Sequence, residues 1–366
     1  MPLSRSVSWA VPAVAIAAVA SAVVLPSTLA SAVSPDLPER SAAELLASLA
    51  DAGETPLSGT VVQTARLGLP ELPGGSAGTT PLAMLTGSHT LRVWSDGPER
   101  VRLALLGELA EYDVVRDGRD AWTYSSEQDE AVHYVLPAGH ERPAATATPP
   151  TPQDAAEQVL EAVDPTTAVR VDDTARVAGR DAYQLVVEPR DAGSLVGSVR
   201  LAVDAATSVP LRVQVWSVQD ASEPALEVGF TEVAFDRPDA SVFDFAAPPD
   251  ATVKDVVVPE SKGHGKEHGK QDGKQHGEGR DGRGARSGDS PAEVTGEGWA
   301  RVVELPGLDD AALQESGSGG MLDSLTTRVP EGRLVTTRLL SALVTDDGRL
   351  LVGAVPGDRL RDSARG

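Results

Sequence analysis

The sequence predicts an α+β protein with one large, mostly antiparallel sheet of about ten strands and two helices. Apolar and polar residues alternate over many short runs, which is the period of a strand with one buried face. Asp-Gly and other turn residues separate several of these runs and indicate hairpins. Two stretches with helical spacing lie among them. This order fits one curved sheet or open barrel with its helices on one side.

The N-terminal segment has the features of a secretory signal peptide over residues 1–32. Arg5 precedes an apolar run from Trp9 to Leu25, and Ala30-Ser31-Ala32 forms a small-x-small cleavage site. The run has 17 residues, fewer than the roughly 20 that span a bilayer. We therefore expect cleavage after Ala32 and an exported protein of the cell envelope. The alternative is that the segment stays in place as an anchor.

The first half of the sheet is expected to begin after a short helix at 41–51. Ser41 and Glu44 have the spacing of a capping box, and leucines follow at helical intervals. From Leu57 the period changes to two, which predicts a strand at 57–67. A meander of further strands is predicted at 89–94, 100–106, 111–115, 121–126 and 131–136.

A second helix is predicted at 153–163, with Val159, Leu160 and Val163 on its apolar side. Strands resume after it, and the segment closes with a Pro-rich stretch at 241–253. The strands of this half are predicted at 174–179, 181–189, 199–204, 210–218 and 225–235.

The hairpin at 199–218 has two alternating runs around a short turn. Asp204 ends the first run, where its carboxylate can accept backbone N–H groups of the turn. Pro210 opens the second run, where a missing N–H donor is tolerated. The turn explains Asp204 without a catalytic role.

Composition divides the rest of the chain. Residues 256–296 are rich in Gly, Lys, His and acidic residues, and 262–286 hold no apolar residue larger than alanine. Such a stretch cannot bury enough surface to offset chain entropy, so we predict a disordered linker. It would join a domain at 33–255 to a small α+β module at 297–366. That module is expected to have a strand at 298–305, a helix at 308–315 and a hairpin within 334–356 that turns at Asp346-Asp347-Gly348.

Charge and composition exclude several functions. The net charge of −22 disfavours binding to nucleic acid or to an anionic membrane surface. The absence of cysteine excludes disulfides, thiolate catalysis, Cys-ligated metal and a lipid-modified N-terminal cysteine. Basic residues of the linker could still contact an anionic surface.

Catalytic and cofactor motifs are absent from the sequence. It holds no G-x-S-x-G nucleophile elbow, because its GGSAG stretch at 74–78 lies in a Pro/Gly loop, and it holds no H-E-x-x-H and no phosphate-binding loop. His89, His133 and His140 are expected to be solvent-facing residues of strands or loops, and His264, His268 and His276 lie among linker glycines. The neighbouring acids Asp172-Asp173, Glu108 with Glu111, and Asp346-Asp347 are expected in turns or on polar faces. We therefore predict no enzyme, no metal site and no cofactor.

A broad aliphatic sheet face remains as the candidate binding surface. One interpretation is that this face is the hydrophobic core and is covered by the two helices. The functional interpretation is that the helices cover it only in part and leave a groove that takes an aliphatic ligand. The candidate groove residues are Leu91, Val93, Val101, Leu103, Leu105, Val114, Leu185, Val187, Val199, Leu201, Val203, Leu211, Val213 and Val215.

Three segments resemble the closing half of the LolA/LolB/RseB (MucB) superfamily: GRDAYQLVVEPR (179–190), SVRLAVDAATSVPLRVQVWS (198–217) and GFTEVAFDRPDASVFDFAAPPDATV (229–253). The shared pattern is a hairpin whose first strand ends in Asp and whose second begins with Pro-Leu, then a strand, a Phe-x-Phe and a Pro-rich exit. The resemblance covers about 41–255 and is strongest to the LolA-like proteins of actinobacteria. One isoleucine and no asparagine also indicate a high-GC genome.

The resemblance implies a half-open antiparallel barrel whose helices form a lid over a pocket for acyl chains. It implies a non-catalytic carrier or sensor of lipids or lipoproteins. The low aromatic content, 4%, is a departure from the carriers, as is the lack of an identifiable lid arginine. The alternative is an RseB-like regulator that contacts a membrane-anchored anti-sigma factor; a transporter is a further possible partner.

Overall fold

The computed structural model describes residues 35–50, 52, 55–69, 85–107, 110–137, 150–161, 163–257, 293–305 and 325–365. Within these residues the strands form two sheets, one of 13 strands and one of six. The expected signal peptide, most of the expected linker and the expected helix at 308–315 lie outside the described residues.

The first half of the large sheet is a meander in which consecutive strands pair antiparallel. Its β2–β3 and β4–β5 turns are the Asp-Gly turns that the sequence predicts, with positive φ at Gly97 and Gly118. The strands are β1 (Leu57–Arg66), β2 (Thr86–Ser95), β3 (Arg100–Leu106), β4 (Glu111–Asp117), β5 (Asp120–Ser125) and β6 (Glu130–Val135).

The second half follows helix α2 (Pro152–Glu161). Here β9 pairs with β7, β8 and β10, and the hairpin of β10 and β11 leads into β12. These strands are β7 (Thr167–Val171), β8 (Ala175–Val177), β9 (Arg180–Pro189), β10 (Val196–Asp204), β11 (Pro210–Ser217) and β12 (Leu226–Ala234).

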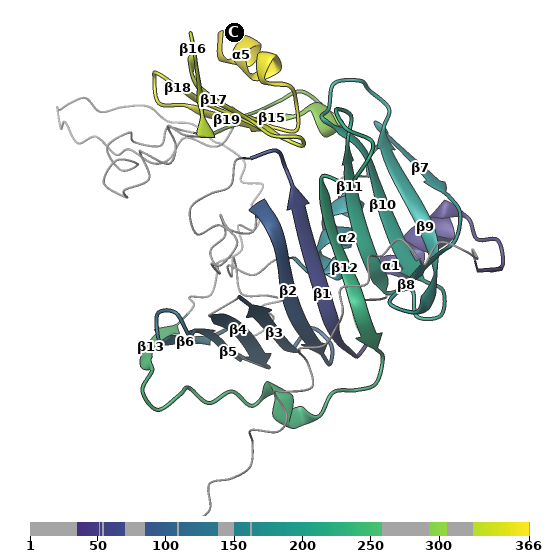
Figure 1. The fold of residues 1–366 in the computed structure, drawn as a ribbon, viewed down its shortest axis with the longest axis vertical. Helices are drawn as coiled ribbons and strands as arrows, with labels where there is room; N and C mark the ends of the chain where they lie inside the picture. Colours follow the sequence, from purple (N-terminus) through teal and green to yellow (C-terminus); the bar gives the residue numbers. More distant parts are fainter. Residues whose placement is uncertain are drawn as a thin grey trace, which may run out of the picture. The chain divides into compact units, whose positions relative to one another are not determined.

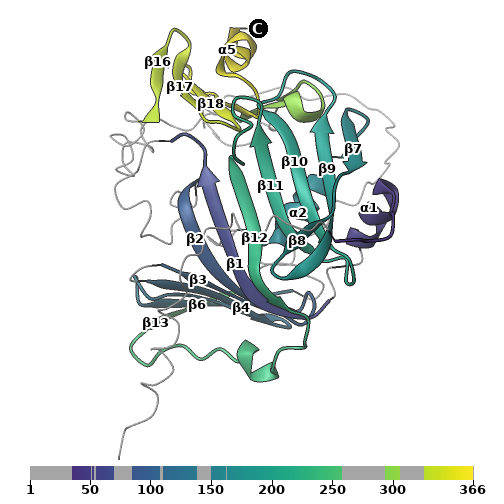
Figure 2. The ribbon, with the colours of Figure 1, turned by 45° about the vertical axis from the view of Figure 1, so that its right-hand side comes forward.

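The two halves join through β1 and β12, which are antiparallel neighbours at the centre of the sheet. A bulge at Thr60/Val61 interrupts their register, and such bulges increase local twist. Figure 2 shows β3–β6 turned away from β1 and β12, so the sheet is strongly curved. It does not close into a barrel, because β13 and β7 are its two edges.

Two short helices pack on one face of the second half, which we call the inner face. Helix α1 (Ala42–Ala50) begins with the predicted capping box, since Ser41 Oγ accepts from Glu44 N–H and Glu44 accepts from Ser41 N–H. Figure 1 places α1 and α2 beside β8–β12. This confirms helices on one side of the sheet.

The opposite, outer face of β3 and β4 is covered by the chain that follows β12. A 3-10 turn, η4 (Ala240–Phe243), places Phe243 at 2% exposure. Arg102 on β3 donates to the carbonyl of Val242 and pairs with Asp113 on β4. The chain then reaches β13 (Thr252–Val257), which pairs parallel to β6.

The small sheet has the order β14-β15-β19-β18-β17-β16. Helix α5 (Gly357–Arg365) packs on it, and Arg361 and Arg365 both pair with Glu331, lowering the pKa of that carboxyl to about 2. The strands are β14 (Glu293–Thr295), β15 (Val302–Leu305), β16 (Thr327–Val329), β17 (Gly332–Thr336), β18 (Ser341–Thr345) and β19 (Leu350–Gly353).

Specific hydrogen bonds connect the small sheet to the large one. The backbone N–H of Arg338 donates to Leu67 O at 2.9 Å, and that of Leu195 donates to Ala354 O at 2.7 Å. The guanidinium of Arg338 pairs with Asp220 and Glu223 in the loop between β11 and β12. The two sheets therefore share a hydrogen-bonded interface.

The α+β class and the hairpin turning at 346–348 agree with the sequence prediction, whereas several details differ. The large sheet has more strands than expected, because β7 and β13 were not predicted. Val256 and Val257 belong to β13 and Glu293–Thr295 form β14, so both ends of the expected 256–296 linker are in strands. Among the described residues, no helix is long and apolar enough to cross a membrane.

Candidate functional site

The aliphatic part of the inner face lies on β9, β10 and β11. Cross-strand partners here are Val187–Val199–Val215 and Leu185–Leu201–Val213, so each row of the face is made of branched aliphatic side chains. Directly opposed residues of antiparallel strands share one face and pack together. The result is a continuous apolar surface with no polar side chain in either row.

Both helices seal this surface with apolar side chains. Leu45 and Leu49 of α1 and Ala156 and Val159 of α2 pack in one core cluster with the sheet. The candidate groove residues in this cluster are Leu185, Val187, Val199, Leu201, Val203 and Val213, all buried, with half-buried Val215 against them. In the structure, therefore, this part of the candidate groove is a closed core.

The remaining candidates lie on β2, β3, β4 and the start of β11. Leu91, Val93, Leu105 and Leu211 are buried in a second core cluster, against which Leu103 packs. Val114 is 7% exposed, and Val101 is half-buried. The ladder pairs Val93 with Leu103 and Leu103 with Val114, so these three share a face.

The inner face becomes polar toward β4–β6, which the sequence reasoning missed. The ladder places Tyr112 opposite Leu105 and Ser125, and Thr123 opposite Val114. Burial raises the pKa of Tyr112, while a hydrogen bond with Thr123 opposes that shift. Following the period-two alternation of the predicted 111–115 and 121–126 strands would have identified these hydroxyls. The face is aliphatic at one end and carries hydroxyl groups at the other.

Asp204 accepts backbone N–H groups of the turn, as the sequence predicts, and it also forms an ion pair. It is 1% exposed and accepts from the N–H groups of Ala206 and Thr207. Arg180 on β9 forms a two-pronged ion pair with it. Burial alone would raise the pKa of Asp204, but Arg180 and Thr207 hold that pKa below its ordinary value. The carboxylate is thus a structural anion.

Three of the neighbouring acids that the sequence singles out form ion pairs. Asp172 pairs with Arg170, Asp346 with Arg328, and Asp347 with Arg349. Glu108 lies outside the described residues. No cluster of three or more metal-ligating His, Asp or Glu side chains occurs within the described part of the chain.

The expectation that the strand histidines face solvent is wrong for His89. It is 6% exposed, because it lies opposite Gln63 near the centre of the sheet, and its Nε2 lies 2.9 Å from Thr86 O. His133 is held between two carboxylates. His140 and the three linker histidines are outside the described residues.

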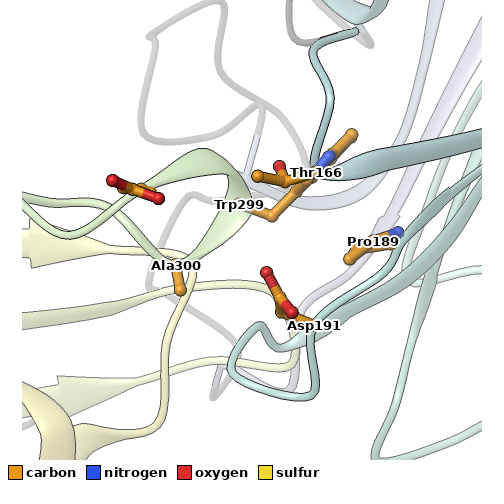
Figure 3. A pocket seen from close by; sticks show the side chains of 6 residues that line it. Thr166, Pro189, Asp191, Trp299 and Ala300 are labelled. Carbon is orange, nitrogen blue, oxygen red and sulfur yellow. The ribbon is translucent and has the colours of Figure 1, made fainter.

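A small hollow of about 10 Å³ lies where the two sheets meet (Figure 3). Trp299 contributes to its wall and is fixed there, since its Nε1 donates to Thr167 Oγ1 at 2.9 Å. Ligand pockets usually begin at roughly 300 Å³, so this hollow is too small for a long acyl chain. Its lining residues are Thr166, Pro189, Asp191, Glu297, Trp299 and Ala300.

Comparison with known proteins gives structural neighbours only. No family model and no curated protein matches the sequence. The fold resembles that of MucB and of LolA-superfamily proteins. The MucA/MucB complex of Pseudomonas aeruginosa is matched with 19% identity and a TM-score of 0.42, over 88% of this chain and 96% of the other.

Two further structures match a smaller share of the chain. A LolA-superfamily protein of Nitrosomonas europaea has 12% identity and a TM-score of 0.22, over 57% of this chain and 99% of that one. LprF of Mycobacterium bovis has 12% identity and a TM-score of 0.31, over 58% and 97%. These neighbours include the proteins that the sequence resemblance names. Since these TM-scores lie below 0.5, the proposed function rests on the chain's own residues.

Proposed function

We propose that this chain is an exported, non-catalytic protein of the cell envelope that holds acyl chains of lipids or lipoproteins against the inner face of its large sheet. The observation that carries the proposal is the aliphatic face of β9–β11, which is covered by two short helices through apolar side chains. In this proposal residues 33–255 bind the ligand, and the candidate groove residues form its wall.

An acyl chain can replace the helix side chains that cover the inner face. Each buried Leu or Val contributes roughly 1.5–3 kcal/mol, so Leu45, Leu49 and Val159 together contribute about 5–9 kcal/mol to covering the face. A chain of about 16 carbons contributes roughly 12 kcal/mol when fully buried. An acyl chain can therefore take the place of the helix side chains with a net gain, and the helices act as a lid.

The polar end of the inner face fits the other part of such a ligand. With the acyl chain along β9–β11, a polar headgroup or peptide would lie toward Tyr112 and Thr123. Hydroxyl groups suit a ligand that is apolar at one end and hydrogen-bonding at the other.

Uptake of a fluorescent long-chain fatty acid tests this function directly. Val215→Glu places a charge on the inner face at a half-buried position, and we expect it to reduce uptake at least tenfold, because a buried unpaired carboxylate opposes an apolar ligand. Gln214→Ala changes the preceding residue of β11, on the outer face, and should leave uptake unchanged. Circular dichroism verifies that both variants fold.

Native mass spectrometry of protein purified from its own host supplies the second arm. We expect a bound lipid or lipoprotein fragment. No co-purified lipid, together with no uptake of the fluorescent probe by the unmodified protein, would contradict the proposal.

A second candidate is a regulator that acts through protein contacts, in the manner of RseB with an anti-sigma factor. The hydrogen-bonded docking of the small sheet on the large one favours it, since the pair forms one composite surface. Specific co-purification with a membrane-anchored anti-sigma factor would support this candidate. An adjacent sigma or anti-sigma gene would favour it as well, whereas an adjacent transporter gene would favour trafficking.

A further inference from the structure

His133 on β6 lies between carboxylates from its two neighbouring strands. Its Nε2 is 3.0 Å from Oδ1 of Asp120 on β5, and its Nδ1 is 3.1 Å from Oδ1 of Asp255 on β13. The imidazole is also stacked on Trp122, with ring centroids 4.3 Å apart and planes at 16°. The ring is thus fixed on three sides.

Each ring nitrogen faces a carboxylate oxygen, so both contacts are hydrogen bonds only when each nitrogen carries a proton. Ionised carboxylates only accept hydrogen bonds, and a neutral imidazole has one N–H donor, whereas the imidazolium has two. Stacking on the Trp122 face also favours the cation. The charged form of His133 can satisfy Asp120 and Asp255 together; the neutral form can satisfy one of them.

The strand that Asp255 belongs to is the most weakly embedded part of the large sheet. All six residues of β13 are exposed, and its only sheet partner is β6, to which it runs parallel. Apart from this ladder, the structure gives β13 the bond from Thr252 N–H to Asp129 O, the pair of Lys254 with Glu130 and the His133–Asp255 contact. The charged groups that face His133 are Asp120 from β5 and Asp255 from β13.

We propose that His133 is a proton-dependent latch on β13. The charged imidazole ties β13 to β5 and β6, and its neutralisation releases one of the two ties. Histidine is the side chain whose charge ordinarily changes between pH 5 and 8. Opening β13 uncovers the N–H and C=O groups of β6, which form an edge able to accept another strand.

Hydrogen exchange of the full-length protein at pH 5.5 and pH 8.0 tests the latch. After correction for the intrinsic exchange rate, we expect residues 252–257 to lose about three- to tenfold in protection at the higher pH, the size of one exposed charge-assisted contact. The opposite edge strand, β7, should change less than twofold.

Three variants separate the latch from a general effect of pH. His133→Gln should exchange at both pH values as the unmodified protein does at pH 8.0. Asp255→Asn should remove the pH dependence, since its amide can bond to the neutral ring; at 78% exposure the side chain can change without loss of fold. Asp117→Asn, an exposed carboxylate of β4, should keep the wild-type pH dependence.

Two results would overturn the proposal. One is equal protection of residues 252–257 at both pH values in the unmodified protein. The other is a pH dependence that persists in Asp255→Asn.

Discussion

At the scale of single residues, Asp204 shows how one side chain serves local and distant structure at once. Its turn contacts to Ala206 and Thr207 could be anticipated, because an Asp at the end of a strand often accepts backbone N–H groups. Its partner Arg180 could not, because that contact depends on the register of β9 against β10. Sequence spacing alone does not supply that register.

Replacing Asp204 should be costly. Asp204→Ala leaves the Arg180 guanidinium half-buried without its partner and removes the turn contacts, so we expect the free energy of unfolding to fall by about 2–4 kcal/mol. Asp181→Ala, which removes an exposed partner of Arg176, should cost less than about 1 kcal/mol. Urea denaturation followed by tryptophan fluorescence measures both, and equal costs would contradict the structural role.

The same carboxyl should make stability depend on pH. Because the folded-state pKa of Asp204 lies below its ordinary value of 3.8, its contribution is present above about pH 4 and is lost as the pH falls through the folded-state pKa. We expect the difference in stability between the wild type and Asp204→Ala to be large at pH 6 and to shrink as the solution is acidified below pH 4.

At the scale of elements, the alternation of apolar and polar residues predicts strands that have one buried face. It does not predict strands that have no buried face. The strands of the central meander were predicted close to their observed bounds. β13 was missed, since all six of its residues are exposed and its sequence carries no burial pattern. The polar inner face of β4–β6 was not predicted, because the candidate groove was assigned from aliphatic residues alone and Tyr112 and Thr123 are not aliphatic.

Helix α1 provides the prediction at this scale. Leu45 is fully buried in the core cluster, and Leu45→Ala should lower the free energy of unfolding by about 2–4 kcal/mol. Leu46→Ala, at a half-buried position of the same helix, should cost clearly less. If α1 is a lid, Leu45→Ala should also speed uptake of the fluorescent fatty acid, as stopped-flow fluorescence would show.

At the scale of the whole molecule, the two sheets are joined by contacts that no local pattern encodes. The sequence predicts two folded regions on either side of a polar stretch but not the hydrogen bonds between them. Arg338 lies within the predicted C-terminal hairpin at 334–356. In the structure its backbone N–H donates to Leu67 O, just after β1, and its guanidinium pairs with Asp220 and Glu223 in the β11–β12 loop.

Arg338→Ala should therefore weaken the joint between the sheets. We expect faster hydrogen exchange at residues 218–225 and at 337–340, with little change in β2–β5. Arg328→Ala removes an exposed pair with Asp346 within the small sheet and should leave residues 218–225 unchanged. An unaltered exchange rate at 218–225 in Arg338→Ala would show that the backbone bonds alone hold the interface.

The central pairing of β1 with β12 also sets the order in which the chain can fold. β1–β6 and β9–β12 each pair strands that are neighbours in the sequence, so each group can form as soon as it is synthesised. The pairing of β1 with β12, for example of Ala65 with Leu226, can form only after β12 has been synthesised. Closing so long a loop is slow, since its entropy must be paid before the contact forms. Until then the free edge of β1 is open to wrong partners, so the newly made chain needs protection along this edge for longest.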